Sequence, residues 1–404
     1  MNRYVSLAMI GVLMLGMALT ACTPGEESLS GTVVLWHAWK ESEIAGLNEV
    51  IAAFQAANPD VTVEVLYTPF DDLRNKFETS AATGSGPTVL IGASDWGEPM
   101  YQANLIVGLD DMITDELQNS IIESAWGGVT AGDGTIVGLP QTLKGVVLFR
   151  NTQIIPEAAT TWDEFAAAAA AATAGDVVGA DLEYGFFFSA AHLTACGGEL
   201  MTANGDPAFN NEAGVCWIEL LQSFEDVGPA EYYTDNDVDL FKAGQAGYVI
   251  DGTWNTSGLA EAIGAENLAI DLWPTYNGSH LSGYVQTENI YLSVNAVDAD
   301  RDASWAFMEF FVSEEAQAIL ANPSGAAHIP VVSSVAVTDP LMQGALDAFA
   351  AQGTPFPVIA EMGAYWGPMD TALQSVFYEG ADPATALETA YESVTAGIAD
   401  IRGE

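Results

Sequence analysis

Strand and helix patterns alternate near the N-terminus, and this alternation constrains the fold more than any other feature of the sequence. Thr32 to Leu35 is a short β-branched, apolar run, and Glu41 to Ala57 carries apolar residues at spacings of three and four. The strand pattern returns from Val61 and again from Thr88, each time beside a helical or loop segment. Repeated strand–helix units predict an α/β protein with a mostly parallel sheet and right-handed crossovers.

Aromatic and polar residues stand where two of these strands run out. Trp36, His37 and Trp39 follow the first strand, and Asp95 and Trp96 follow the third. Ligands of open α/β sheets bind at the carboxyl ends of the strands, so these five residues are candidate ligand-binding residues. Their indole rings are either a flat platform on which a sugar ring can stack or packing residues at the core and its rim.

The N-terminus has the pattern of an export signal. One positive charge precedes an apolar run from Val5 to Leu19, and small residues lead to Cys22. Leu19 to Cys22 resembles the bacterial lipobox, which implies removal of residues 1–21 and lipid attachment to the Cys22 sulfur. The alternative is a plain signal peptide with a chance cysteine. Residues 22–30 are then expected to be a polar tether to the cell membrane, on its extracytoplasmic side.

The remaining chain of roughly 380 residues is too long for one compact core and suits two lobes. Its formal charge is −46, from 9 basic and 55 acidic residues in the full sequence. Such a charge excludes nucleic acids and anionic membrane surfaces as favoured partners. We expect a surface suited to high salt or low pH, where screening or protonation relieves the repulsion among carboxylates.

Two cysteines remain once Cys22 is assigned to the anchor. Cys196 and Cys216 are an even pair in an exported chain, which favours a disulfide between them. Two buried free thiols are the alternative.

A series of motifs runs through nearly the whole mature chain. They are Val33–Trp36, Asn58–Val63, Lys76–Pro87, Asp95–Gly97, Gly138–Pro140, Val146–Asn151, Thr161–Phe165, Phe209–Asn211, Phe241–Gly244, Val249–Trp254, Ser313–Gln317 and Ala364–Met369. In this order they resemble the extracellular solute-binding proteins of ABC sugar importers, of the maltose/maltodextrin-binding type (family 1). No single motif is diagnostic, but the series is.

The resemblance implies a two-lobed periplasmic-binding-protein fold of type II. Each lobe would be a mostly parallel sheet flanked by helices and built from discontinuous segments. The expected divisions are residues 31–139 plus 290–333 for lobe 1, 144–285 plus 338–404 for lobe 2, and chain crossings near 138–143, 286–290 and 329–338.

The resemblance also implies site residues. Asp95, Trp254 and Trp366 match positions that contact sugar in the family. The other candidates are Tyr365, beside Trp366, and two residues of the second expected crossing, Glu288 and Asn289.

Lys144 stands where the family has a glutamate in the cleft. It either donates hydrogen bonds to the ligand or pairs with a neighbouring acid. This departure puts the identity of the sugar in doubt, because the polar recognition has changed.

The function that the resemblance implies is capture of an extracellular oligosaccharide in an interlobe cleft and its delivery to an ABC permease. We expect a monomer without cofactors. The rival binding function is capture of a polyamine by carboxylates and aromatic rings. Catalysis has little support, because the four histidines are isolated, without the spacing of metal ligands. A glycosidase carboxylate pair is the weaker alternative, since 55 acids guarantee chance pairs.

Overall fold

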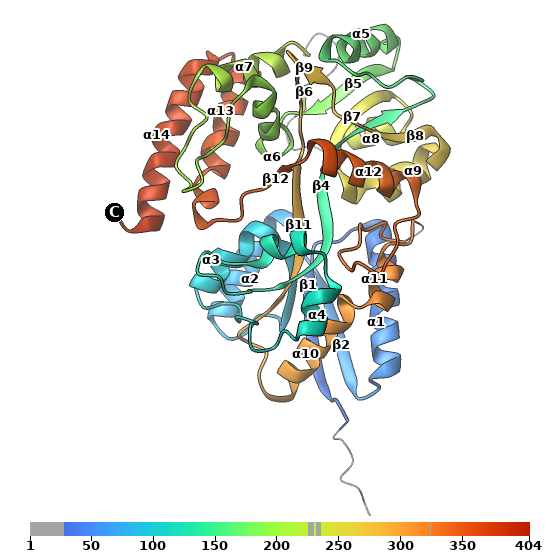
Figure 1. Ribbon diagram of the computed structural model, residues 1–404, viewed down its shortest axis with the longest axis vertical. Helices are drawn as coiled ribbons and strands as arrows, with labels where there is room; N and C mark the ends of the chain where they lie inside the picture. Colours follow the sequence, from blue (N-terminus) through green and yellow to red (C-terminus); the bar gives the residue numbers. More distant parts are fainter. Residues whose placement is uncertain (1–27, 225–229, 232–235, 324) are drawn as a thin grey trace, which may run out of the picture.

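The computed structural model describes residues 28–404 except 225–229, 232–235 and 324. The chain forms two lobes, one above the other in Figure 1. The expected signal peptide, the lipidation site Cys22 and most of the tether lie outside the described residues. Among the helices that the structure describes, none combines the length and the apolar character needed to cross a bilayer.

Lobe 1 is built on the strands that the sequence predicts. β1 (Gly31–His37) lies between β2 (Val61–Tyr67) and β3 (Val89–Ala93), and all three are parallel. The inward side chains Val33 and Leu35 are fully buried, as β-branched and apolar residues of a central strand should be. Parallel pairing brings the carboxyl ends of the three strands to one edge of the sheet, and this edge faces lobe 2.

Two long antiparallel strands connect the lobes. β4 (Leu139–Asn151) and β11 (Tyr284–Leu292) pair with each other, with an irregularity in register between Glu288 and Asn289. One end of β11 pairs with β3, and the far end of β4 continues into the sheet of lobe 2. The first two expected crossings are therefore parts of continuous strands, and the second lies inside β11.

The sheet of lobe 2 continues from β4. It contains β5 (Val178–Glu183), β6 (Ala230–Glu231), β7 (Ala246–Gly252) and β8 (Leu268–Asp271). β7 and β8 are antiparallel to β4, whereas β5 is parallel to β7 and to β6. The combined strand order is β2-β1-β3-β11-β4-β7-β5-β6, and the short β12 (Thr354–Pro355) pairs with β11. A separate two-stranded sheet is formed by β9 (Thr275–Tyr276) and β10 (Ser279–His280).

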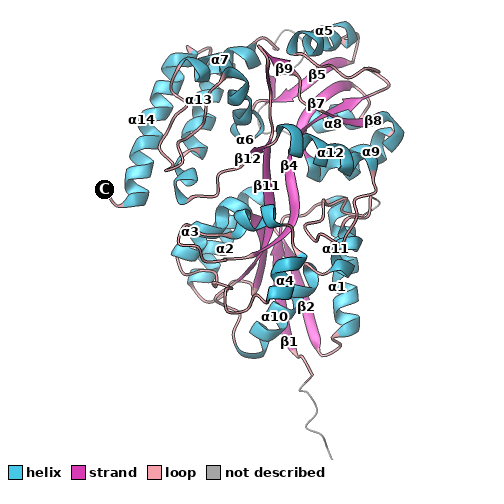
Figure 2. Cartoon of the chain, in the orientation of Figure 1, coloured by secondary structure: helices cyan, strands magenta, loops and turns pink. Residues whose placement is uncertain are grey.

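Helices flank the sheet in both lobes (Figure 2). Those of lobe 1 are α1 (Glu41–Ala57), α2 (Phe70–Ala82), α3 (Gly97–Gln102), α4 (Asp115–Ser120), α10 (Asp298–Phe311) and α11 (Glu314–Leu320). Those of lobe 2 are α5 (Trp162–Ala172), α6 (Phe186–Ser189), α7 (Glu212–Gln222), α8 (Asn236–Lys242), α9 (Thr256–Ile263), α12 (Pro340–Gln352), α13 (Trp366–Glu379) and α14 (Pro383–Arg402). Short 3₁₀ turns include Ser94–Trp96, Glu123–Val129 and Ala360–Ala364.

The buried apolar side chains separate by lobe. Those packed around β1, β3 and the lobe 1 end of β11 come from the chain up to Leu139 and again from Ile290 to Val331. Those of lobe 2 come from Val146 onward, from the C-terminal helices and from Ile329. Each lobe is thus assembled from segments that are far apart in the sequence. The residue-level division between the lobes stays a prediction.

The segment around α6 is joined to lobe 2 by a disulfide, as the sequence predicts. The aromatic run at 186–188 forms the short helix α6. Cys196 and Cys216 form a disulfide, with their Cα atoms 6.0 Å apart, which joins the turn after α6 to α7.

Candidate functional site

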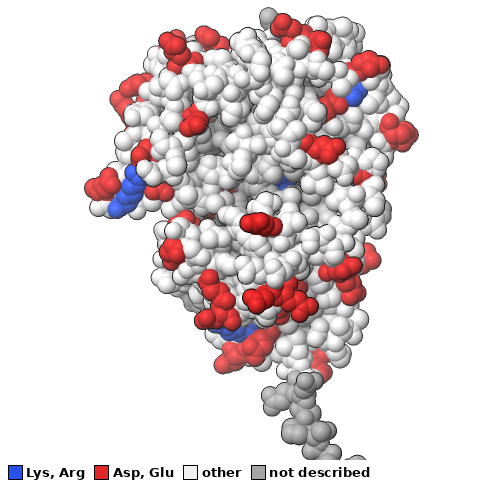
Figure 3. Space-filling view, viewed as in Figure 1, with Lys and Arg blue, Asp and Glu red and all other residues white. Residues whose placement is uncertain are grey.

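The candidate site lies where the carboxyl edge of the lobe 1 sheet faces lobe 2. The space-filling view is hollowed between the two lobes (Figure 3). The edge carries the 3₁₀ turn Ser94–Trp96, directly after β3. This turn approaches the 3₁₀ turn Ala360–Ala364, which leads into α13. Segments of both lobes therefore meet at the place where a sheet of this type binds ligands.

A direct contact joins the lobes at this point. The indole Nε1 of Trp366, the first residue of α13, donates a hydrogen bond of 3.3 Å to Oδ2 of Asp95. Asp95 is only 6 % exposed, and Trp366 is half-buried. The two residues are 271 positions apart in the chain, and sequence analysis named both as ligand-binding candidates.

Burial raises the pKa of Asp95 to about 6, against the opposing effects of Arg74 and of the Trp366 hydrogen bond. A carboxylate in a dry site costs free energy unless its oxygens receive hydrogen bonds. Asp95 is therefore a strong acceptor that a hydroxyl group could satisfy better than the single indole does.

Lobe 2 supplies a cluster of aromatic rings next to Trp366. Phe187 is at its centre, with ring centroids 6.2 Å from both Trp254 and Trp366. Phe356 lies 5.5 Å from Phe187 and 5.7 Å from Trp366, and Phe188 lies 6.4 Å from Trp254. Trp254, Phe188 and Trp366 are half-buried, so part of each ring faces solvent. This is the arrangement that stacks on the apolar faces of a ligand.

Trp254 is held over the end of β7 by a glycine. A Cβ added at Gly252 would lie 2.1 Å from the Trp254 ring, so only glycine leaves room for the indole at this distance. The local sequence that follows β7 thus fixes the direction of the ring.

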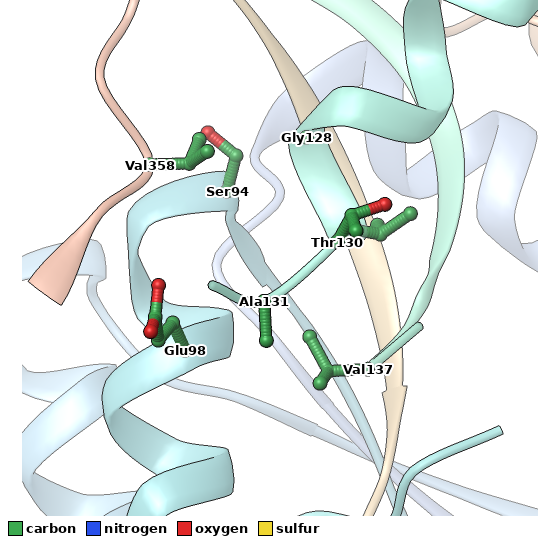
Figure 4. Close-up of a pocket in the computed structure, with 8 residues that line it drawn as sticks. Ser94, Glu98, Gly128, Thr130, Ala131, Val137 and Val358 are labelled. Carbon is green, nitrogen blue, oxygen red and sulfur yellow. The ribbon is translucent and has the colours of Figure 1, made fainter. Parts of the chain in front are cut away.

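A small hollow lies at the junction of the lobes (Figure 4). Val358, which precedes α13, lies beside Ser94 there, while the opposite wall is formed by the chain around Gly128, Thr130 and Val137. The Ser94 hydroxyl donates to Oε1 of Gln286 on β11 at 3.0 Å. Through Ser94, the 3₁₀ turn after β3 is therefore bonded to the connecting strand β11, and it lies beside Val358 of the segment that leads to α13.

Residues 49–348 match the family described as bacterial extracellular solute-binding protein. The chain belongs to this family. Membership places the protein outside the cytoplasm and among binding proteins.

Two curated relatives are identical to this solute-binding protein at about a quarter of the aligned residues. The galactooligosaccharide-binding protein of Bacillus subtilis (strain 168) is 24% identical, over 95% of this chain and 94% of the relative. The maltotriose-binding protein of Pyrococcus abyssi is also 24% identical, over 88% of this chain and 79% of the relative.

Solved structures share the two-lobed fold. The GacH receptor of Streptomyces glaucescens matches with a TM-score of 0.83 at 20% identity, over 92% of this chain and 99% of that chain. The maltose/maltodextrin-binding domain of Bdellovibrio bacteriovorus, bound to maltotriose, matches with a TM-score of 0.83 at 24% identity. The match covers 91% of this chain and 100% of that chain.

The three candidate tryptophans of lobe 1 are buried in this structure. Trp39 is 2 % exposed, and its Nε1 donates to Glu288 at 2.8 Å. Trp36 is 8 % exposed beneath Lys76, whose Nζ lies 5.0 Å from the ring centroid. Trp96 is 5 % exposed. In this structure all three take the packing role, which is one of the two roles considered for them.

Lys144 pairs with acids, which is one of the two roles considered for it. Its Nζ lies 3.0 Å from Glu43 at the start of α1 and 3.0 Å from Glu288 on β11. Glu43 also bonds His328 Nε2 at 2.9 Å, and Gln141 Nε2 donates to Glu288 at 2.6 Å. This buried network joins the two connecting strands to α1 and to His328.

The candidates His37 and Asn289, like Tyr365 below, have hydrogen-bond partners within the protein. His37 is buried, its Nδ1 accepts from the Trp39 backbone N–H, and burial lowers its pKa to about 4. The Asn289 amide donates to the Gly128 carbonyl and to the Tyr291 hydroxyl.

Tyr365 is fully buried, and its hydroxyl donates to the Gly205 carbonyl at 2.8 Å. We expect it, with His37 and Asn289, to support the site rather than to touch a ligand.

Sequence analysis did not name Phe187, Phe188 or Phe356 as site residues. The run of phenylalanines at 186–188 was the available signal, but only the fold reveals that it packs beside Trp254 and Trp366. Among the described residues, no group of three or more His, Cys, Asp or Glu side chains is placed to hold a metal ion.

Proposed function

We propose that this solute-binding protein captures an oligosaccharide between its lobes and delivers it to an ABC permease. The observation that carries the proposal is the Asp95–Trp366 contact across the cleft, flanked by the half-buried rings of Trp254 and Phe188. Neutral sugars need aromatic faces for their C–H surfaces and polar acceptors for their hydroxyls. Both are present here, on opposite lobes.

The relatives support this assignment. Two curated relatives that align along most of the chain are named for galactooligosaccharide and maltotriose, and two solved structures contain maltotriose. We assign the same class of ligand to this protein without assigning its sugar or linkage.

Capture would proceed by closure about β4 and β11. A ligand favours the closed form only by making better contacts there than in the open form. Sugar hydroxyls that replace the indole at Asp95, and rings that stack between the lobes, provide such contacts. The closed form would then present surfaces of both lobes to the permease, as hinge closure does in periplasmic binding proteins.

The anchor completes the proposal. Lipid on Cys22 would hold the protein at the outer side of the cell membrane, and residues 22–30 would act as its tether. The protein would work as a monomer.

A thermal-shift screen tests the ligand class. Mono- and oligosaccharides of different linkage are compared with spermidine and putrescine. A saccharide at about a hundred times its Kd should stabilise the protein by about 2.7 kcal/mol and raise Tm. A shift with the polyamines alone would overturn the proposal, and so would release of reducing ends from a bound oligosaccharide.

Gly252→Ala tests the site without removing a ring. The added methyl group would collide with Trp254 and force it aside, so affinity for the saccharide should fall by about tenfold, the effect of losing roughly one aromatic contact. Gly367→Ala is the matched control, because a Cβ there meets open space beside Trp366. Equal affinities of the two variants would argue against a role for Trp254.

A further inference from the structure

Phe70 is an exposed aromatic residue at the cleft end of α2. It continues the apolar stripe of Leu73, Phe77 and Ala81, which are buried under the helix. Side chains at these spacings share one helix face. Phe70 is 49 % exposed, while Leu73 and Phe77, further along the same stripe, are fully buried. The apolar stripe is therefore exposed to solvent in the first turn of α2. This turn lies at the carboxyl end of the neighbouring strands, where the cleft begins.

The Phe70 ring has a firm support. Its centroid lies 5.0 Å from that of Trp96, at an interplanar angle of 34°. Trp96 is itself buried and covers Gly92, where an added Cβ would lie 2.4 Å from the indole. An exposed ring on a packed indole keeps its orientation at little entropic cost when it meets a ligand.

The same support places Phe70 beside the site. Trp96 follows Asp95 in the 3₁₀ turn, and Asp95 accepts the hydrogen bond from Trp366 of lobe 2. Phe70 is therefore connected through one indole to the point where the lobes meet. A ligand held at Asp95 must extend past Trp96 to reach it.

Arg74 adds a hydrogen-bond donor on this side of α2. It follows Phe70 by four residues, one helical turn, and so shares its face. Its Nε donates to Glu78 at 2.8 Å, and its charge acts on Asp95. Exposed Asp71 and Asp72 lie on the first turn of α2, so the surroundings favour neutral hydroxyl groups over an anionic sugar.

We infer that Phe70 and Arg74 form an additional subsite, in which one pyranose ring stacks on Phe70 while Arg74 donates to its hydroxyls. The inference rests on the proposed function and deepens it. The protein selects oligosaccharides long enough to extend from Asp95 past Trp96, and shorter sugars leave this subsite empty.

Calorimetric titration with a length series of one saccharide linkage tests the subsite. Phe70→Ala should weaken binding of the longer members by about threefold to tenfold, the usual effect of one aromatic contact, and leave the shortest bound member unchanged. Phe70→Leu retains apolar cover for Trp96 without an aromatic face, and it should show the same loss. Phe70→Trp should keep the preference for length.

Tyr391→Ala on α14 is the control, because it removes another partly exposed aromatic ring outside the cleft. It should change no affinity. A loss with Phe70→Ala that is equal at all lengths, or absent at all lengths, would overturn the subsite while leaving the proposed function standing. A wild-type protein that binds no saccharide would overturn the proposed function, and the subsite with it.

Discussion

At the junction of the lobes, Asp95 lowers the free energy of unfolding and provides a hydrogen-bond acceptor for a ligand. Asp95 is buried, and its only hydrogen-bond partner from lobe 2 among the described residues is the Trp366 indole. Burial raises its pKa from 3.8 to about 6. Between these two values the folded protein binds more protons than the unfolded chain, so the free energy of unfolding falls as pH rises through this window.

Asp95→Asn should therefore stabilise the free protein while weakening ligand binding. At pH 7 the free energy of unfolding should rise by about 1–3 kcal/mol, because the neutral amide avoids the cost of a buried charge. The gain should vanish below about pH 4, where the wild-type carboxyl group is protonated. Urea unfolding at both pH values, with titration of a bound saccharide, measures both effects.

Asp111→Asn serves as the control for this change, since Asp111 is exposed. It should shift the free energy of unfolding by less than about 0.5 kcal/mol. If Asp95→Asn were destabilising at pH 7, or if it left affinity unchanged, Asp95 would not be a strained acceptor at the site.

The exposure of the candidate indoles depends on whether they lie in a loop or inside the sheet and its core. Trp254 and Trp366 lie past a strand end or at a helix start and retain exposed edges. Trp36 lies within β1 itself, and Trp39 turns back into the lobe 1 core against Phe311. Which way an indole turns depends on the helices packed against the strand, and the local sequence does not encode that packing.

At the scale of elements, β4 and β11 connect the lobes and also carry the buried charges of Lys144 and Glu288. Lys144 on β4 bridges Glu288 on β11 and Glu43 on α1. Burial opposes ionisation of Glu43, but Lys144 and His328 outweigh it and lower its pKa to about 2. The sequence could not predict this network, because its members come from four separate segments of the chain.

Lys144→Met should destabilise the protein by about 3–5 kcal/mol at pH 7, since it leaves two buried carboxylates without their cation. The stabilisation that wild-type Glu43 contributes is fully present above pH 4.5 and is lost as pH falls toward 2. In the variant, Glu43 keeps His328 but loses Lys144, so burial is opposed less and the pKa of Glu43 is higher than in the wild type. The difference in free energy of unfolding between the two proteins should therefore shrink between pH 7 and pH 4.

Lys76→Met is the matched control for Lys144→Met. Lys76 is exposed and lies over Trp36, so its removal should cost less than about 1 kcal/mol at either pH. Equal urea midpoints for the two variants would show that the network on β4 and β11 contributes no special stability.

For the whole molecule, charge is the dominant unexplained property. Acidic side chains are spread over the visible face of both lobes in Figure 3, in keeping with 55 acids against 9 bases in the sequence. Few of these carboxylates have a cation within reach, so they repel one another across the surface. The fold class does not depend on this charge, which is why the resemblance to a family predicted it for so acidic a chain.

Added salt should stabilise the protein by screening this repulsion. Raising NaCl from about 0.01 to 1 M shortens the Debye length from about 30 to 3 Å, and we expect Tm to rise by about 5 °C or more. Screening saturates early, so most of the rise should occur below about 0.3 M, and KCl should act like NaCl. Scanning calorimetry across salt and pH measures the effect. A Tm that is highest at neutral pH and low ionic strength would contradict it, and would mean that the carboxylates are spaced widely enough, or hydrated well enough, for their repulsion to cost the fold nothing.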